Sequence, residues 1–403
     1  MIFSIVIPAY NEEEAVQDVL RRCLDAASKL RASGLGVKDV EVILVDDGST
    51  DRTAELARRV EGVRVLAHPG NRGYGAAIKT GFESARGGLL GFLDADGTCD
   101  PAFFADLIGL LQKEGLDAAA GSRMHPGSRM PPLRRAGNRL FRGIVNFIAG
   151  SSVADVASGM RVVRREALAR LYPLPDGLDF TPAMSVRTSL DRRLKAGELA
   201  MPYVERVGRS KLRVVSDGLR FLAAIVGTAL TYRPLFFFGL GSLLAAALAA
   251  WSLASPWGAP HSPLSFYWEH GRLEDWMIFR LILVTFLLAV SAFLAALGAV
   301  AQALVGIING DAGPAGGERA VRLPLSRRLF LWGAAGLASS LVLNRRVLAV
   351  YWKTGHIPSE WWVFPLVGVL FALVGCEFVA FGLVDRIASL LRERERHRSG
   401  TRP

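Results

Sequence analysis

Two stretches in the second half of the chain, 235–255 and 281–308, contain no charged residue. A helix of about 20 apolar residues crosses the hydrocarbon core of a bilayer, so each stretch is long enough to span a membrane. The chain is 51% hydrophobic and its mean hydropathy is +0.29. Disordered chains lack this apolar content. The sequence therefore predicts a membrane protein with a soluble front half.

Four membrane-spanning helices are predicted within a transmembrane domain over 233–390. They cover 235–255, 279–308, 329–344 and 361–384. The third segment is short and is bounded by arginine pairs at 327–328 and 345–346. Glu377 lies in the fourth segment, where a carboxylate is either a functional group or close enough to the cytoplasmic end to reach water.

The distribution of basic residues favours four crossings. Cytoplasmic loops carry an excess of Lys and Arg, and a third crossing keeps the basic tail, 391–403, on the cytoplasmic side together with the loop 310–328. Without that crossing, the six arginines between 386 and 402 would be translocated. With it, Arg345, Arg346 and Lys353 lie outside, against the same rule.

Strands and helices alternate over the first 130 residues. Apolar runs predict strands at 3–7, 40–45, 63–67 and 89–93, and helices at 12–33, from about 51, at 74–85 and at 101–114. Ser49 and Thr50 are the candidate N-caps of the second helix. Repeated strand–helix units predict an α/β fold whose mostly parallel sheet is covered on both faces. The chain starts directly in a strand, without the charged segment of a signal peptide, so we expect this domain, 1–210, to stay in the cytoplasm.

Two amphipathic helices are predicted between this domain and the membrane segments, at about 134–150 and 211–232. The first combines an apolar stripe with several arginines, namely Leu140, Phe141, Ile144, Val145 and Ile148 beside Arg135, Arg139 and Arg142. Surface helices packed on the sheet would have this pattern. Interfacial helices would have it too, with the apolar face in the lipid boundary and arginines at the headgroups. Because membrane segments follow directly, we favour the interfacial interpretation.

The net charge of +11 is compatible with nucleic acid, anionic lipid or a phosphorylated substrate as partner. The sequence contains no nucleic-acid-binding motif, so lipid and phosphates are favoured. Cys23, Cys99 and Cys376 are scattered and odd in number. They predict neither a metal centre nor a disulfide framework.

Acidic residues follow three of the predicted strands. Glu12 comes shortly after the first strand, Asp46 and Asp47 end the second, and Asp94 and Asp96 end the fourth. Ligands of parallel α/β sheets bind at the carboxyl ends of the strands, so these groups are expected at one edge. Two carboxylates one residue apart suit a hard divalent cation such as Mg²⁺ or Mn²⁺, which often bridges protein carboxylates and substrate phosphates.

The runs IVIPAYNEE, VDDGSTD, NRGYGAA and DADG, in this order over residues 5–97, resemble the family 2 glycosyltransferases with the GT-A nucleotide-sugar-binding fold. The resemblance covers about residues 1–215. It implies that Asp94 and Asp96 hold the metal on the diphosphate of a nucleotide sugar. It also implies a binding site for the base and ribose, lined by Pro8, Tyr10, Glu12 and Asp46, with Asp47 assisting.

Looser matches after residue 120 are similar to the dolichyl- or polyprenyl-phosphate sugar synthases, whose acceptor is a membrane lipid phosphate. They include Gly121-Ser122-Arg123, Asp155 with Ser158-Gly159-Met160-Arg161, and the run 206–211. The resemblance implies that Arg206 and Lys211 clamp the diphosphate, and that Arg123, Arg134 and Asn138 hold the lipid phosphate. Thr98 stands where these synthases often carry a glutamine, so metal coordination there would use a hydroxyl or water.

The implied reaction moves a sugar from a UDP- or GDP-sugar to a polyprenyl phosphate with inversion at the anomeric carbon. A phosphate acceptor is already anionic and needs no general base, whereas a hydroxyl acceptor does. Two alternatives stay open. One is another membrane transferase of the same family, acting on a glycolipid or polysaccharide, and the other is a non-enzymatic transporter or flippase component. The sequence leaves open the sugar, the lipid length and whether the protein forms a homo-oligomer in the cell membrane.

Overall fold

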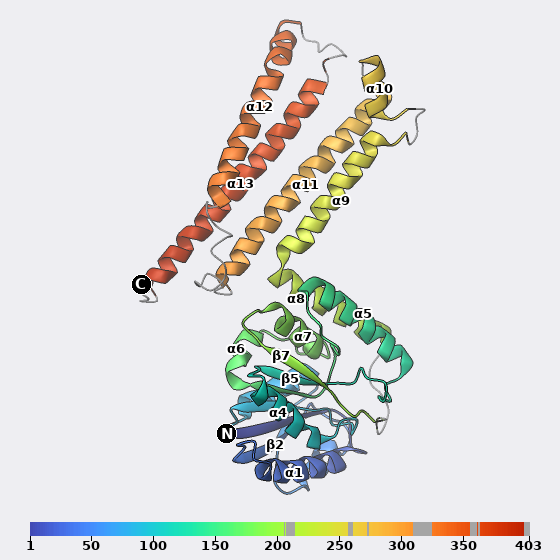
Figure 1. The fold of residues 1–403 in the computed structure, drawn as a ribbon, viewed down its shortest axis with the longest axis vertical. Helices are drawn as coiled ribbons and strands as arrows, with labels where there is room; N and C mark the ends of the chain where they lie inside the picture. Colours follow the sequence, from blue (N-terminus) through green and yellow to red (C-terminus); the bar gives the residue numbers. More distant parts are fainter. Residues whose placement is uncertain are drawn as a thin grey trace. The chain divides into compact units, whose positions relative to one another are not determined.

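The computed structural model describes residues 1–204, 206, 214–256, 261–271, 274–308, 325–354, 361 and 363–398. Within that part, one seven-stranded sheet and its helices make up the front half, and long helices make up the rest (Figure 1). The chain divides into two units, Met1–Ala229 and Leu230–Pro403.

The sheet has the order β3-β2-β1-β4-β6-β5-β7. Its strands are β1 (Ile2–Ala9), β2 (Asp39–Asp46), β3 (Val63–Ala67), β4 (Leu89–Phe92), β5 (Ala118–Ser122), β6 (Arg161–Arg164) and β7 (Ala196–Ala200). β6 runs antiparallel to β4 and β5, and the remaining pairs are parallel. The predicted α/β fold with a mostly parallel sheet is thus confirmed.

Helices cover both faces of this sheet. The helices of this half of the chain are α1 (Val16–Ala32), α2 (Thr53–Arg58), α3 (Tyr74–Ser84), α4 (Phe104–Lys113), α5 (Pro132–Ala149), α6 (Leu168–Leu171), α7 (Phe180–Leu190) and α8 (Val214–Tyr232). α1 and α4 pack on one face of the sheet and α3 and α7 on the other, whereas α5 packs on α7. Short 3₁₀ turns at Pro101–Phe103 and Arg165–Ala167 precede α4 and α6. α8 is the counterpart of the second amphipathic segment, of which residues 211–213 lie outside the described part.

The sheet has a hydrophobic core on each face, and side chains alternate along β1 between the two cores. Phe3, Ile5 and Ile7 point to one face and pack with α1 and α4, where Phe3 meets Phe104 edge-on at 5.1 Å between ring centroids. Val6 points to the other face, in the core shared with α3 and α7. Because both faces are buried, β1 is apolar almost throughout, as central strands of parallel sheets are.

The predicted N-caps of α2 are wrong. α2 begins at Thr53 with Arg52 as its N-cap residue. Ser49 Oγ instead accepts a hydrogen bond from the Asn11 amide at 2.9 Å, and Asp51 Oδ1 accepts one from the Thr53 amide at 2.9 Å. Residues 49–51 therefore tie the end of β2 to the loop after β1, and the helix starts later.

The second unit contains α9 (Pro234–Ala254), α10 (Pro263–His270), α11 (Asp275–Ile308), α12 (Leu325–Thr354) and α13 (Val363–Arg398). α9 packs on α11, α11 on α13 and α13 on α12 (Figure 1). Among the described residues, three stretches are long and apolar enough to cross a membrane: Pro234–Ala254, Trp276–Gly306 and Val363–Asp385. They coincide with the first, second and fourth predicted segments.

The third predicted segment, 329–344, lies within α12. Its apolar centre is short and is bounded by two arginine pairs, which lowers the hydropathy of the helix as a whole. The four-span topology and the cytoplasmic side of the tail therefore stay predictions. Residues 399–403 of that tail lie outside the described part.

Candidate active site

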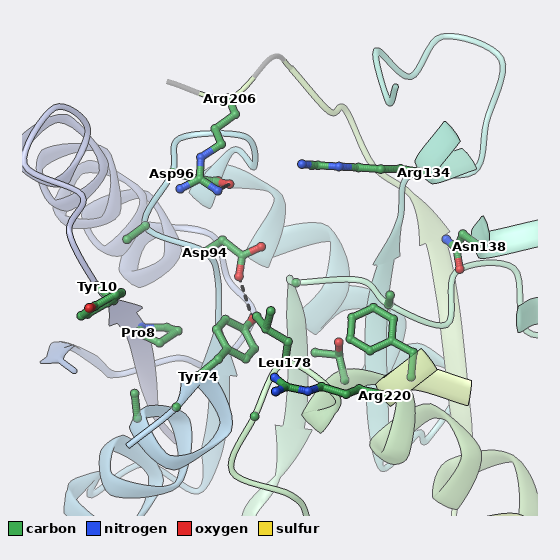
Figure 2. Close-up of a pocket in the computed structure, with 18 of the residues that line it drawn as sticks. Pro8, Tyr10, Tyr74, Asp94, Asp96, Arg134, Asn138, Leu178, Arg206 and Arg220 are labelled. Atoms are coloured by element: carbon green, nitrogen blue, oxygen red, sulfur yellow. Dashed lines mark hydrogen bonds and ion pairs between the residues drawn. The ribbon is translucent and has the colours of Figure 1, made fainter. Parts of the chain in front are cut away.

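The loops after β1, β2 and β4 meet at one cavity of about 490 Å³ in the first unit (Figure 2). Most of the predicted site residues line it: Pro8, Tyr10, Glu12, Asp47, Asp94, Asp96, Arg123, Arg134, Asn138 and Arg206. Asp46 is buried and does not line this cavity. Lys211 lies outside the described residues.

Asp94 and Asp96 form the acidic part of the cavity. Burial, and then the charge of Asp96, raise the pKa of Asp94 to about 7. The Tyr74 hydroxyl donates a hydrogen bond of 2.7 Å to Asp94 Oδ1 (Figure 2). Burial and the charge of Asp94 raise the pKa of Tyr74, so this hydroxyl keeps its proton. The sequence motif NRGYGAA contains Tyr74, but its spacing gave no sign of this contact.

Two neighbours fix the orientation of this acidic pair. The Thr98 hydroxyl donates to Asp96 Oδ1 at 2.7 Å, and the Thr98 amide to the same oxygen at 3.1 Å. Gly159 lies against Asp94, because a Cβ atom there would come within 2.1 Å of Asp94 Oδ2. Thr98 is therefore occupied as a donor to Asp96.

The acidic pair suits a divalent cation by its chemistry. Both ligands are carboxylates, which Mg²⁺ and Mn²⁺ prefer, and a cation between them would relieve the repulsion that raises the pKa of Asp94. Among the described residues, no group of three or more His, Cys, Asp or Glu side chains is placed to hold a metal. The remaining ligands would have to come from a bound substrate or from water.

Asp47 holds the neighbouring turn in place. Its Oδ1 accepts from the Arg72 amide at 2.9 Å and its Oδ2 from the Gly73 amide at 2.8 Å. The His68 ring lies 2.7 Å from Asp47 Oδ1. Asp46 Oδ1 accepts from the Ser49 amide at 3.3 Å within its own turn. The second carboxylate of the VDDGSTD motif, and not the first, reaches the cavity.

Arg206 lies above Asp96 in Figure 2. It forms an ion pair with Glu12 and lies 3.7 Å from Asp96 Oδ2. The preceding residues pair with the acidic loop, since the Val204 amide donates to the Thr98 carbonyl at 3.2 Å. The Nε of Arg206 is buried and lacks a hydrogen-bond partner within the described ranges. Arg206 therefore has a donor available beside the acidic pair.

Arg123, which lines the cavity, forms a buried ion pair with Asp155. Arg123 Nε lies 2.7 Å from Asp155 Oδ2, and Nη2 lies 2.9 Å from Oδ1. The Asn138 amide group donates to Asp155 Oδ1 at 2.7 Å. Burial disfavours the charged form of Asp155, but the charge and hydrogen bonds of Arg123 outweigh it and lower the pKa of Asp155.

This pair leaves one part of Arg123 available. Nη2 also donates to the Ala157 carbonyl at 2.6 Å, whereas Nη1 makes no hydrogen bond within the part of the chain that the structure describes. The Arg123 guanidinium lies over the Tyr203 ring at 5.6 Å from its centroid. The side chain is thus held rigidly, with one nitrogen free for a ligand. Asn138, which also lines the cavity, donates to Asp155.

The cavity also has an apolar wall, made by α5 and α8. Leu133, Gly137 and Phe141 come from one face of α5, and Phe221 comes from α8. Phe141 and Phe221 meet edge-on at 6.0 Å between centroids. Arg220 of α8 lines the cavity as well, next to Leu178 and Tyr74 in Figure 2. Arg220 belongs to the second predicted amphipathic segment, 211–232, whose pattern gave no sign of a place in a site.

Three large apolar side chains of α5 are exposed, and the first of them, Leu133, also lines the cavity. The exposed fractions of Leu133, Leu140 and Phe147 are 64%, 62% and 75%. Their spacing of seven residues places them along one side of the helix. Large apolar side chains in a row on a surface mark an interaction site.

Comparison with known proteins connects this site to a family. The model of the family "Glycosyl transferase family 2" matches residues 4–172. The dolichyl-phosphate hexose transferase of Haloferax volcanii is 32% identical over 231 residues, which cover 57% of this chain and 95% of that relative. The low-salt glycan biosynthesis hexosyltransferase Agl6 of the same organism is 31% identical over 264 residues, which are 64% of this chain and 61% of that relative.

Bacterial proteins are similar too. The undecaprenyl-phosphate 4-deoxy-4-formamido-L-arabinose transferase of Edwardsiella ictaluri is 31% identical over 238 residues, covering 58% of this chain and 69% of that relative. Among solved structures, glucosyl-3-phosphoglycerate synthase from Mycobacterium tuberculosis, in complex with Mn²⁺, UDP and phosphoglyceric acid, superposes with a TM-score of 0.44 at 23% identity. That superposition covers 57% of this chain and 78% of the other. The family model and the nearly complete match to the Haloferax volcanii transferase show that this chain is a glycosyltransferase of family 2.

Proposed function

We propose that this glycosyltransferase moves a sugar from a UDP- or GDP-sugar to the phosphate of a polyprenyl phosphate, with inversion at the anomeric carbon. One observation carries the proposal. A single cavity is lined by the acidic pair Asp94 and Asp96, by the buried Arg123, and by apolar side chains of α5 and α8. Such a cavity offers a place for a diphosphate, for a second phosphate and for the start of an apolar chain.

The donor would bind on the side of the strand ends. Pro8 lies near the end of β1, and Tyr10 and Glu12 follow the strand. These three residues would line the base and ribose site, with Asp47 holding the turn at Gly73. Arg206 would meet the diphosphate, since a guanidinium suits phosphate oxygens. Asp46 and Lys211 remain predicted donor-site residues. Asp46 would then act from beneath the cavity, through the turn that it caps at Ser49.

A divalent cation, Mg²⁺ or Mn²⁺, held by Asp94 and Asp96 would supply charge stabilisation to the departing diphosphate. The protein's own part is to aim these carboxylates. Tyr74 and Gly159 fix Asp94, and Thr98 fixes Asp96. Positioning of this kind needs no reorganisation during the reaction, which makes electrostatic stabilisation effective.

The acceptor phosphate would bind at Arg123 Nη1, with Arg134 and Asn138 near it on α5. An oxygen of this phosphate attacks the anomeric carbon. The bond from that carbon to the diphosphate breaks, and the electron pair leaves with the nucleoside diphosphate. Because the phosphate is already anionic, no side chain has to remove a proton from it.

The membrane would supply the acceptor. The exposed row Leu133, Leu140 and Phe147 suits a helix lying in the lipid boundary. A single residue separates the end of α8 from the start of the candidate span α9. Polyprenyl phosphate could then present its phosphate while its chain remains in the bilayer. We place the catalytic unit on the cytoplasmic side of the cell membrane, as the basic loops and tail predict.

The test uses the purified full chain in detergent with Mn²⁺ or Mg²⁺ and a panel of UDP- and GDP-sugars. Undecaprenyl phosphate and dolichyl phosphate serve as acceptors, and the unphosphorylated polyprenol and diacylglycerol as controls. Release of nucleoside diphosphate and the product mass are measured. We expect a sugar-phospholipid only with the phosphorylated acceptors. Transfer to diacylglycerol or to a polysaccharide instead would overturn the proposal.

A further inference from the structure

α8 carries an arginine into the cavity. Phe221 is 8% exposed and packs edge-on against Phe141 of α5, so this contact fixes the rotation of α8. Arg220, the residue before it, lines the cavity and lies beside Leu178 and Tyr74 in Figure 2. Gly218, three residues before Phe221, also lines the cavity and carries no side chain to fill the space.

The cavity is otherwise rich in negative charge. Glu12, Asp47, Asp94 and Asp96 all line it. Two of the positive charges that line it are compensated, because Arg206 is paired with Glu12 and the side chain of Arg123 makes two hydrogen bonds to Asp155. A phosphate dianion that enters this cavity must overcome repulsion from the carboxylates.

Arg220 is less compensated. Its side chain is 74% exposed, and its partner within the described ranges, Asp217, lies 3.8 Å away. That distance is too long for a hydrogen bond, so the planar fork of N–H donors on Arg220 is available to a ligand.

We propose that Arg220 binds the phosphomonoester of the acceptor and thereby brings α8 into the acceptor site. The inference rests on the proposed function and adds to it a residue outside the motifs of the first 215 residues. The guanidinium offers a fork suited to phosphate oxygens. α8 leads directly into a candidate membrane span, which suits a ligand whose apolar tail stays in the bilayer.

The experiment compares Arg220→Ala and Arg220→Lys with the unaltered chain. Arg59→Ala is the matched control, because Arg59 is also exposed and paired with an acid one helical turn earlier in the chain, Glu55, but does not line the cavity. Initial rates are measured against polyprenyl phosphate at saturating donor, and against donor at saturating polyprenyl phosphate.

A charge-assisted hydrogen bond contributes enough to change an affinity by about tenfold or more. We therefore expect Arg220→Ala to raise the KM for polyprenyl phosphate by about that factor and to leave the KM for the donor unchanged. Arg220→Lys should restore part of the loss, because it keeps the charge but not the fork. Arg59→Ala should behave like the unaltered chain.

Each of the following results would overturn the inference. An unchanged KM for polyprenyl phosphate in Arg220→Ala excludes the contact, and a raised KM for the donor places Arg220 on the diphosphate. A third result would show that Arg220 binds the headgroups of the bilayer and not the acceptor. To test for it, the assay is repeated in nanodiscs of phosphatidylcholine with and without phosphatidylglycerol. If Arg220→Ala raises the KM for polyprenyl phosphate only when phosphatidylglycerol is present, Arg220 binds headgroups. An unaltered chain that uses no polyprenyl phosphate overturns the proposed function itself, and this inference with it.

Discussion

Gly159 and Asp94 approach each other so closely that any side chain at position 159 would displace the carboxylate. A Cβ atom there would lie 2.1 Å from Asp94 Oδ2 and 2.6 Å from its Cγ. The other oxygen is bound by Tyr74, so Asp94 is held from two sides. Gly159 comes 65 residues after Asp94 in the chain (159 − 94), and only the fold brings the two together.

The first prediction concerns this contact. Gly159→Ala should force Asp94 out of position and lower kcat by tenfold or more, roughly the effect of losing 1.4 kcal/mol of transition-state stabilisation. Overpacking should also cost about 1–3 kcal/mol of stability. Turnover and the melting temperature of the full chain are measured together. Gly88→Ala is the control, because a Cβ there meets nothing within 4 Å. Full activity in Gly159→Ala would show that Asp94 needs no fixed orientation.

The second prediction concerns the metal. Asp94→Asn and Asp96→Asn keep the size of the side chains but remove the charges that would hold the cation. A bound metal stabilises charge by several kcal/mol, so each variant should lose activity by on the order of a hundredfold or more. EDTA should abolish the activity of the unaltered chain, and added Mn²⁺ or Mg²⁺ should restore it. Asp18→Asn, on the exposed side of α1, serves as control. Activity that survives EDTA and both substitutions would contradict the metal site.

The sheet could be predicted from sequence because its determinants are local. The buried run of β1 and the apolar runs of β2 and β3 are continuous in the chain, and they predict strands close to the observed ones. The antiparallel insertion of β6 between β4 and β5 could not be predicted in this way. A strand of four residues has the same apolar pattern in either direction, and only its neighbours decide which one it takes.

The site was predictable where it lies in motifs and unpredictable where it depends on packing between distant segments. The acidic residues at the strand ends were expected at one edge of the sheet from their position in the chain, and all but Asp46 line the cavity there. The choice between Asp46 and Asp47 depends on which carboxylate meets the amides of Arg72 and Gly73, and adjacent residues of the same type look alike in a sequence. The role of Asn138 as a donor to Asp155 likewise follows from a contact and not from spacing.

The third prediction concerns Arg123. Removing one partner of a buried ion pair costs about 3–5 kcal/mol, so Arg123→Ala should lower the melting temperature and also raise the KM for lipid phosphate. Arg123→Lys should fold better and recover only part of the acceptor affinity, because a point charge does not reproduce the fork. Asp46→Ala should affect the donor KM first. An Arg123→Lys enzyme that loses donor binding and keeps its lipid KM would place this arginine in the donor site.

The fourth prediction uses the lowered pKa of Asp155. A carboxyl whose pKa is lower in the folded state than in the unfolded state adds stability above its unfolded pKa, about 3.9. That stability is lost as the pH falls through the folded pKa. The melting temperature of the full chain should therefore fall more steeply below about pH 4 than that of Asp155→Asn. Asp155→Asn should already be less stable at pH 7, because Arg123 is left unpaired. Equal acid slopes in the two proteins would show that Asp155 adds no pH-dependent stability.

The last prediction concerns α12, whose membrane crossing decides on which side the tail lies. Backbones of α12 and α13 approach closely at two glycines: a Cβ on Gly333 would lie 2.8 Å from the Gly375 carbonyl, and one on Gly375 would lie 2.9 Å from the Gly333 carbonyl. Small residues allow this kind of contact between helices within membranes, which favours α12 crossing beside α13.

In a Cys376→Ser background, Ser359→Cys should react with an impermeant maleimide from outside intact cells, whereas Glu61→Cys and Ser399→Cys should react only after permeabilisation. Gly375→Leu should separate the two helices and reduce the yield of folded protein, unlike Val367→Leu on an exposed part of α13. Labelling of Ser399→Cys in intact cells, with Ser359→Cys protected, would remove the third span and place the arginine-rich tail outside.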